Sequence, residues 1–477
     1  MLKSLGVNSI AQYLSCLLLH ILSKANYSML ENNPRLKNIL IASLIVIAAL
    51  GMRIAYVVGT DVDLPIRADA RSYVNYAQNL VNHGTFSKET SKNPTPDSFW
   101  SPGYPAFLAT NIYLFGIKHL YPTTQFLQAL LGALASVMVF VIGLFFLPRW
   151  AATLAGLLTA CSPHLISLGS YLLTETLFAF TLLSFLLLYI IAIRTEKSCY
   201  FASSGAVAGV SYLVNPVIFF APFIMAGLFF IKKIHHRPSL IAKKKQLIVI
   251  FLLAFMTPWT LWTVRCCLNV PVTSDSATNR ALVNLIVGAH HDFYEIWRAD
   301  PRDPTNPVEV DKRRVNSSWS KFLNILGRRI VDNPWHYTKW YFYEKPKLLW
   351  SWDILTGQGD VYVYPVITSW FQTSLFASGL HFVMKSIHWW LLFLGFLGGL
   401  FLHRFWHSEQ GEVIITLYAV TVYVSAVYVI LQSEARYSIP LRPAMYLCAS
   451  FGLWQVGCAA RNWLNNFREK MPQRVIQ

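Results

Sequence analysis

Apolar runs close to 20 residues long recur along this chain and are separated by mostly short polar connections. The hydrocarbon core of a bilayer is about 30 Å thick, so a helix needs about 20 residues to cross it. The alternating pattern of a membrane β-barrel strand is not found. The pattern predicts an all-α polytopic membrane protein with about ten transmembrane helices, at residues 38–59, 123–147, 151–168, 173–194, 200–216, 217–231, 246–264, 386–402, 412–431 and 441–460.

Charged residues orient these ten crossings across the membrane. Lys and Arg concentrate in connections such as KKIHHRPSLIAKKK, residues 232–245, whereas all twelve aspartates, from Asp61 to Asp360, fall in the other set of connections. Basic connections face the cytoplasm by the positive-inside rule. Both chain ends are therefore expected in the cytoplasm, and the first long polar loop is expected outside it.

The spans and connections divide the chain into five parts. Residues 10–22 are interpreted as an interfacial or additional helix rather than as a cleaved signal. Residues 265–385 interleave Trp and Tyr with Lys and His, which is typical of a segment lying at the headgroup level. The parts are an N-terminus that is cytoplasmic or interfacial (1–37), a transmembrane domain (38–264) with an outer loop (60–122), an outer segment (265–385), C-terminal transmembrane helices (386–460) and a cytoplasmic tail (461–477).

Composition agrees with this organisation and excludes several classes of function. The chain is 55% hydrophobic and only 13% charged, which is too apolar for a soluble protein of 477 residues. Its net charge of +17 is explained by the cytoplasmic connections, so no nucleic-acid partner is inferred. Seven cysteines show neither metal-ligand spacing nor a disulfide framework. Phosphate-binding loops of the GxxxxGK[ST] or GxGxxG type are absent, so any reaction needs an already activated substrate.

The first outer loop carries the first candidate for chemistry. Asp69 begins a stretch with helical spacing, in which Tyr73, Ala77 and Leu80 share one side. A carboxylate at this position could act as a general base or bind a divalent ion. The alternatives are a helix N-cap or a solvated loop charge.

Several stretches in the same order resemble the lipid-linked sugar transferases of the C-type glycosyltransferase fold. This family includes the dolichyl-phosphate-mannose protein mannosyltransferases and the bacterial aminoarabinose transferases of lipid A. The similar stretches are Arg53, DARSYVNYAQNLVNHGTFS (69–87), SPGYPAFLA (101–109), LLTETLF (172–178), MTPWTLWTVR (256–265) and SEARYSIPLRP (433–443).

The resemblance implies an inverting transferase that uses a polyprenyl-phosphate sugar, with an acidic residue of the first outer loop near the reacting centre. Asp69 falls on that position, so the outer loop 60–122 is expected to be catalytic. Many relatives carry an Asp-Glu pair there, whereas this chain has Asp69-Ala70. A divalent cation is therefore kept only as an alternative cofactor, and no metal-binding residue is assigned.

Two ionisable residues at the membrane edge are expected near this site. Glu175 stands at the outer start of a span and should face the protein interior or a wet cavity, because an ionised Glu in lipid costs about 2.5–3.5 kcal/mol. It is the second predicted catalytic residue, and a helix-start role is its alternative. Arg53, late in the first span, is expected to pair with a loop carboxylate.

Arginines on the outer face are predicted to bind the donor phosphate. A guanidinium matches phosphate oxygens in pairs, and Arg436 lies in a short outer loop next to Tyr437. Contact with lipid headgroups or a surface pairing between Glu434 and Arg436 would explain the same residues. Arg265 and Arg442 are further candidates for binding the phosphate, and Arg71, which is close to Asp69 in sequence, could hold either the phosphate or the carboxylate.

Four further residues complete the predicted substrate-binding set. Tyr73 and Tyr104 belong to the first outer loop, and His290 and His291 belong to the stretch NLIVGAHHDFYEIW. The histidine pair lacks the spacing of a metal motif, so it is assigned only as a substrate contact.

The sequence therefore predicts an integral membrane glycosyltransferase, placed in a bacterial inner membrane with its active site facing the periplasm or cell exterior. Its partners are a polyprenyl-phosphate sugar donor, membrane lipid and an acceptor that is a glycolipid, a cell-envelope glycan or a protein. The alternatives are a flippase or transporter of lipid-linked saccharide, and a ligase or polymerase of pyrophosphate-linked glycans. Transporters spread charges along their spans, whereas these charges cluster outside. The sequence does not identify the sugar or the acceptor.

Overall fold

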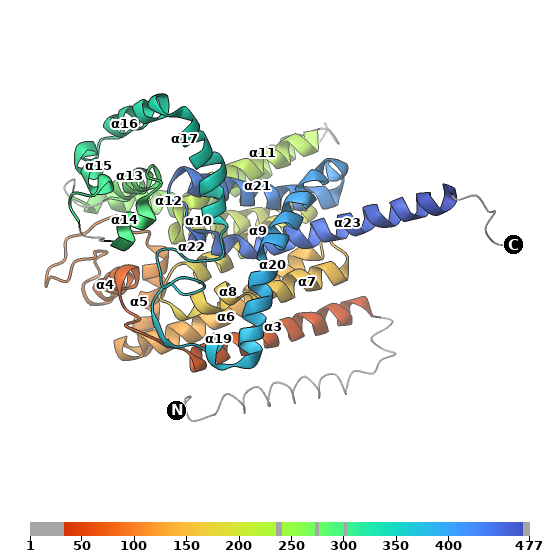
Figure 1. The fold of residues 1–477 in the computed structure, drawn as a ribbon, viewed down its shortest axis with the longest axis horizontal. Coiled ribbons are helices and arrows are strands. Elements are labelled where there is room, and N and C mark those ends of the chain that lie inside the picture. Colours follow the sequence, from red (N-terminus) through yellow and green to blue (C-terminus); the bar gives the residue numbers. More distant parts are fainter. Residues whose placement is uncertain (1–32, 235–240, 272–275, 300–302, 471–477) are drawn as a thin grey trace.

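The computed structural model describes residues 33–234, 241–271, 276–299 and 303–470. Long helices dominate it and form a bundle, as Figure 1 shows. They are α3 (Pro34–Gly59), α6 (Leu120–Gly143), α7 (Arg149–Cys161), α9 (Glu175–Thr195), α10 (Ser198–Val214), α11 (Ala221–Ile234), α12 (Ile241–Asn269), α20 (Leu375–Leu400), α21 (Glu409–Ile430) and α23 (Arg442–Lys470). The helix predicted at residues 10–22 lies outside the described residues.

The expected all-α polytopic membrane protein is confirmed. Six helices of the described chain are long and apolar enough to cross a membrane, and α7 followed by α8 (Pro163–Ser167), bent by 51°, makes a seventh candidate. The bend occurs at Pro163, whose ring disfavours helical backbone at the residue before it. Each predicted crossing overlaps a helix, but α10 and the 216–231 helix are shorter than a full span. The total of ten therefore stays a prediction.

Shorter elements build one end of the bundle, called the outer end because it carries the polar loop that was predicted to lie outside. Figure 1 shows α4 and α13–α16 at one end of the bundle and the last turns of α23 at the other. These elements are α4 (Ala68–His83), α5 (Gly103–Phe115), α13 (Ala277–Gly288), α14 (Phe293–Ala299), α15 (Pro307–Val315), α16 (Trp319–Asp332), α17 (Pro334–Lys339), the π-helix η6 (Trp340–Glu344), α18 (Lys345–Leu349), α19 (Trp370–Thr373) and α22 (Ala435–Ser438). The 3-10 turns are η2 (Ile117–His119), η3 (Leu168–Ser170), η4 (Pro216–Ile218), η7 (Leu402–Phe405) and η8 (Ile439–Leu441).

The first outer loop is fastened to the outer segment at several points. Strand β1 (Asp61–Val62) pairs antiparallel with β2 (Val366–Thr368). The Tyr364 hydroxyl donates to the carbonyl of Arg67 at 3.0 Å, directly before α4. Tyr73 and Ala77 of α4 are buried in a cluster that also contains residues of the 352–371 stretch. Residues about 300 positions apart in the sequence are therefore packed together.

Helices α10 and α12 pack closely because two glycines face the second helix. A Cβ atom built on Gly205 would lie 2.2 Å from the carbonyl oxygen of Phe251. One on Gly209 would lie 2.7 Å from the Pro258 ring. Small residues four positions apart allow helix backbones to approach each other in membranes. This packing places the outer end of α12 next to the first outer loop.

Gly205→Val should destabilise the protein by about 1–3 kcal/mol, because the added side chain overpacks a backbone contact. Thermal unfolding in detergent, followed by size-exclusion chromatography, measures the effect. Gly227→Val is the matched control, since nothing lies within 4 Å of a Cβ atom built there. Equal melting temperatures for the two variants would contradict the assigned packing.

Candidate functional site

A cavity of about 720 Å³ opens at the outer end of the bundle. Its wall combines the first outer loop, the start of α9, the end of α10 with η4, helix α13, the end of α21 and helix α22. The polar and aromatic lining includes Asp69, Tyr73, Trp100, Glu175, Asn215, Arg280, Tyr428, Arg436 and Tyr437.

Arg436 joins two carboxylates from distant parts of the chain. Its NH1 group donates to Asp69 Oδ2 at 3.0 Å, and its Nε group donates to Glu175 Oε1. The side chain of Arg436 is 12% exposed and that of Glu175 is 7% exposed, whereas Asp69 is 35% exposed. Asp69 is therefore the more accessible of the two carboxylates. A partly buried charge cluster of this kind depends on all its partners, because a lone buried charge is strongly destabilising.

The backbone around Asp69 aims its side chain into the cavity. Asp69 lies in the first turn of α4, where the helix dipole favours a negative charge. It is not the N-cap, since that position belongs to Arg67 and Asp69 itself is bound to Arg436. Ala68 adopts a φ of 46°, which is strained for a residue with a side chain. The Tyr364 hydroxyl accepts from the Ala70 amide at 3.4 Å and holds this turn.

Glu175 is the first residue of α9 and lines the same cavity. Thr174 precedes it without forming a side-chain cap, so the predicted alternative of a capping arrangement is not the contact that forms. The Oε2 atom of Glu175 is buried and has no hydrogen-bond partner among the described residues. Buried polar atoms are normally satisfied, so this oxygen is suited to a donor group of a bound molecule.

Glu434 positions the short helix that carries Arg436. Its buried carboxylate accepts from the Arg436 amide at 2.7 Å and from the Leu355 amide at 2.7 Å. It thus caps α22 and ties it to the outer segment. The alternative of a surface pairing between Glu434 and Arg436 is wrong, because both residues are largely buried and the guanidinium turns to Asp69 and Glu175.

Aromatic side chains form the rest of the wall. Tyr437 stacks on Tyr428 with ring centroids 5.2 Å apart, and Asn215 donates to the Tyr428 hydroxyl at 2.9 Å. Tyr73 lines the cavity and meets the edge of Trp100 at 4.9 Å. Tyr104 packs behind Tyr73 and donates to Gln128 at 2.9 Å, so it supports the wall from outside the lining.

Arg280 is a cavity residue that sequence reasoning missed. It lies in α13, lines the cavity and stacks over the Trp100 ring at 4.6 Å. Within the part of the chain that the structure describes, its guanidinium forms no ion pair or hydrogen bond. Burial lowers the pKa of Arg280 from its usual value. Nothing in ATNRALVN distinguishes Arg280 from a solvated arginine, and only the fold places it opposite Asp69.

Arg53 does not reach a loop carboxylate, and that expectation is wrong. Its NH1 group donates to the carbonyls of Ala49 at 3.0 Å and Ala160 at 3.3 Å, between α3 and α7. Gly132 of α6 makes the space, since a Cβ atom built there would lie 2.5 Å from Arg53 Nε. Backbone carbonyls thus satisfy a buried cation inside the bundle, as intramembrane arginines commonly require.

The other predicted arginines also lie away from the cavity lining. Arg265 donates to the carbonyls of Asp97 at 2.7 Å and Phe86 at 3.2 Å, which fixes the first loop to α12. Arg442 donates to His164 Nδ1 at 2.6 Å and to the Ser351 carbonyl at 3.0 Å. Arg71 is exposed on α4. These three arginines are therefore suited to structural contacts rather than to binding a ligand in this cavity.

His290 and His291 belong to a separate cluster. His290 contacts Asp311 at 2.7 Å, and Arg329 contacts the same carboxylate at 2.7 Å. His291 pairs with its neighbour Asp292 at the surface. Burial alone would raise the pKa of Asp311, but hydrogen bonds from His290 and Arg329 hold it below its usual value. The cluster joins α15 and α16 to the end of α13.

The carboxylates of the cavity do not fit a divalent cation. Among the described residues, no group of three or more His, Cys, Asp or Glu side chains could hold a metal ion. Asp69 and Glu175 both contact Arg436, whose positive charge lies between them. A dication next to this guanidinium would meet repulsion.

Comparisons with known proteins agree with this architecture. The sequence model of the dolichyl-phosphate-mannose-protein mannosyltransferase family matches residues 100–262, about a third of the chain. The crystal structure of the Archaeoglobus fulgidus oligosaccharyltransferase in the apo form aligns with a TM-score of 0.52 at 13% identity. That alignment covers 91% of this chain and 52% of the oligosaccharyltransferase, so the chain spans about half the length of that protein.

A weaker likeness links the chain to ArnT from Cupriavidus metallidurans bound to undecaprenyl phosphate, with a TM-score of 0.34 and 14% identity. It covers 92% of this chain and 81% of ArnT. No curated protein matches the chain. The resemblance to the C-type glycosyltransferases is confirmed: the chain has the fold of the oligosaccharyltransferase, and residues 100–262 are similar to the mannosyltransferase model.

Asp311→Asn should destabilise the α13–α16 region by about 2 kcal/mol, because His290 and Arg329 lose a charged partner. Asp311 has a depressed pKa, so its stabilising effect is present above about pH 4 and is lost as the pH falls through its folded-state value. Hydrogen exchange of the α13, α15 and α16 amides measures the change. Asp332→Asn, an exposed position on α16, is the control. Unchanged exchange in Asp311→Asn would refute the role.

Proposed function

We propose that this chain, which has the C-type glycosyltransferase fold, transfers a sugar from a polyprenyl-phosphate donor to an acceptor hydroxyl on the outer face of a membrane. The observation that carries the proposal is the contact of Arg436 with both Asp69 and Glu175 at the wall of an outer cavity. The family match over residues 100–262 supports the same class of donor. A bacterial inner membrane with a periplasmic site remains our assignment of location.

The donor phosphate is assigned to Arg280. This guanidinium has no carboxylate partner among the described residues, whereas the charge of Arg436 is balanced by two carboxylates. Arginine binds phosphate oxygens strongly and stays protonated. The prenyl chain would leave the cavity between α11 and α21, where Phe219, Phe220 and Tyr423 form its wall. Phe220 is 58% exposed, so this exit opens toward the bilayer.

Asp69 is assigned as the general base. The acceptor hydroxyl oxygen forms a bond to the anomeric carbon of the donor sugar, and the bond from that carbon to the phosphate oxygen breaks. The bonding electrons leave with polyprenyl phosphate, and the hydroxyl proton moves to Asp69. Attack opposite the leaving phosphate inverts the anomeric centre. Asp69 Oδ2 contacts Arg436, which leaves Oδ1 available for the proton.

Glu175 and Arg436 support this step in different ways. Arg436 contacts Asp69 Oδ2 at 3.0 Å and so fixes the position of its carboxylate. The unpartnered Oε2 atom of Glu175 is assigned to a hydroxyl of the bound sugar or acceptor. The leaving phosphate is already charged, so Arg280 contributes by stabilising negative charge rather than by donating a proton.

The acceptor enters between the first outer loop and the outer segment. The cavity wall there contains Trp100, Asn284 and Trp319, and aromatic faces of this kind suit sugar rings as well as lipid headgroups. Glycolipid, cell-envelope glycan and protein acceptors all remain open in this proposal. A flippase of lipid-linked saccharide is the competing function, and it makes no use of a base at Asp69.

Asp69→Asn should lower the rate of sugar transfer by about 100-fold or more, because the amide cannot accept the acceptor proton. The assay uses purified protein, a radiolabelled polyprenyl-phosphate sugar and a panel of candidate acceptors. Asp353→Asn, at an exposed outer aspartate, is the matched control and should keep the parent rate. Full activity of Asp69→Asn would remove Asp69 from the mechanism. Movement of donor across liposomes without any transfer would favour the flippase.

Arg280→Gln should raise the donor KM by about 10-fold or more, because the phosphate loses a charged hydrogen-bond partner. The same assay at varied donor concentration measures the change. Arg314→Gln, an exposed arginine of α15, controls for the loss of one positive charge on the outer face. A donor KM that stays the same in Arg280→Gln would place the phosphate elsewhere.

A further inference from the structure

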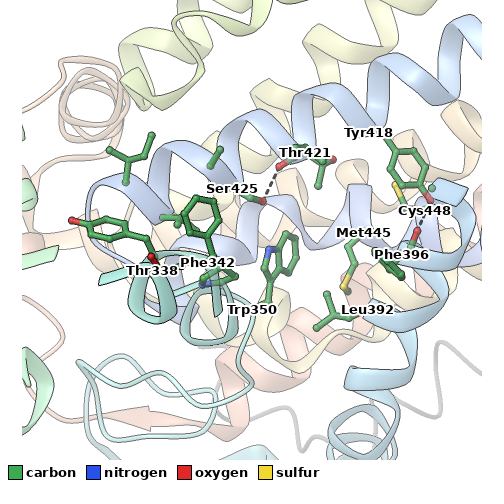
Figure 2. Close-up of a pocket in the computed structure, with 18 of the residues that line it drawn as sticks. Thr338, Phe342, Trp350, Leu392, Phe396, Tyr418, Thr421, Ser425, Met445 and Cys448 are labelled. Carbon is green, nitrogen blue, oxygen red and sulfur yellow. Dashed lines mark hydrogen bonds between the residues drawn. The ribbon is translucent and has the colours of Figure 1, made fainter. Parts of the chain in front are cut away.

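A second cavity of about 960 Å³ lies on the opposite face of α21 from the Asp69 cavity. Figure 2 shows Trp350, Leu392, Phe396 and Met445 around it. Its walls come from α20, α21 and α23, with α17, η6 and α18 at its outer end. Helix α21 thus separates two cavities, because Tyr423 and Val427 face the Asp69 cavity whereas Val422 and Ala426 face the second one.

The lining of the second cavity has almost no group that could bind a polar ligand. No charged side chain is among its lining residues, all of which lie in the described part of the chain. Its serine and threonine hydroxyls and the Tyr418 hydroxyl are bonded within the protein. Thr421 donates to the Leu417 carbonyl at 2.8 Å, Ser425 to the Thr421 carbonyl at 2.7 Å (Figure 2), and Tyr418 to the Gly395 carbonyl at 2.6 Å. A polar molecule would lose its hydration there without compensation.

The second cavity has the length of a hydrocarbon chain. Its α21 lining runs from Tyr418 to Ile430 on one helix face, which at 1.5 Å per residue is about 18 Å. Gly395 and Gly399 of α20 and Ala426 of α21 widen it. Tyr418 closes the inner end by its bond to Gly395. The result is a groove along spanning helices, where the surrounding medium is lipid tails.

The outer end of this groove is basic. Between Arg328 and Lys347 the chain has five basic and two acidic residues. Arg329 is paired with Asp311, and Lys339 is paired with Glu344 at 2.8 Å. Arg328 and Lys347 are exposed and lie within two positions of the lining residues Ile330 and Pro346. Basic residues at the membrane surface attract anionic lipid headgroups.

We propose that this groove, defined by the face of α21 from Tyr418 to Ile430 together with α20 and α23, binds one acyl chain of an anionic phospholipid. The lipid phosphate lies at the rim near Arg328 and Lys347. The chain fills a space that would otherwise lack packing contacts. The lipid-binding proposal does not depend on the proposed transfer reaction, because its test measures lipid binding and not sugar transfer.

The groove ends beneath the loop that leads to Arg436. Lys345 of α18 is buried and donates to the carbonyls of Ile430 at 3.3 Å, Leu431 at 2.8 Å and Gly288 at 3.0 Å. Ile430 lines the groove and Leu431 lines the Asp69 cavity. A lipid packed under this turn therefore supports the outer end of α21, from which the chain continues to α22.

Ala426→Phe should weaken binding of phosphatidylglycerol by about 10-fold, because its ring occupies the groove. Native mass spectrometry of the purified protein with added phosphatidylglycerol or phosphatidylcholine measures the binding. Leu253→Phe, on the exposed face of α12, should bind like the parent. Lys347→Glu should lose the preference for phosphatidylglycerol over phosphatidylcholine. Equal lipid binding by Ala426→Phe and the parent would overturn the proposal.

A photoreactive phosphatidylglycerol, with a diazirine near the end of one acyl chain, tests the same site in the unmodified protein. Peptide mapping should find saturable labelling around Gly395 and Tyr418, at the closed end of the groove. Labelling around Phe219 and Tyr423 instead, or no saturable labelling, would overturn the assignment. Competition by undecaprenyl phosphate that abolishes the labelling would assign the groove to a prenyl chain and would also overturn it.

Discussion

The contact of Arg436 with Asp69 and Glu175 is the interaction on which the outer cavity depends. The three residues come from α22, α4 and the start of α9, so one guanidinium joins three segments of the chain. Removing Arg436 would leave the largely buried Glu175 carboxylate without its charged partner, which is destabilising. The same contact gives Asp69 a fixed orientation, although Ala70 stands where an acidic neighbour was expected.

Most of the charged residues near the membrane surface hold the scaffold together instead of contacting a ligand. Arg265 and Arg442 donate to backbone carbonyls, and Glu434 accepts from backbone amides. Each satisfies polar groups that water cannot reach inside the bundle. This use of charge leaves Arg280 as a cavity cation without a carboxylate partner among the described residues. Arg280 therefore differs from Arg265 and Arg442, whose guanidinium groups are hydrogen-bonded to the scaffold.

Hydropathy was sufficient to predict the helices, since each predicted crossing overlaps one, and the ordered motifs were sufficient to predict the family resemblance. Asp69, Glu175 and Arg436 were each singled out from sequence, yet their mutual contact was not foreseen because they lie up to 367 positions apart. Arg53 was misplaced because small neighbours such as Gly132 expose backbone carbonyls that sequence patterns do not reveal. Arg280 was missed because its chemistry depends on the fold bringing α13 over Trp100.

The central claim is that Arg436 orients the carboxylates whereas other residues bind the donor. Steady-state kinetics of Arg436→Gln tests this claim most directly. If Arg436 orients the carboxylates, kcat should fall by about 100-fold or more while the donor KM changes by less than about 3-fold. A raised donor KM with an unchanged kcat would contradict the account. That result would instead make Arg436 the residue that grips the phosphate.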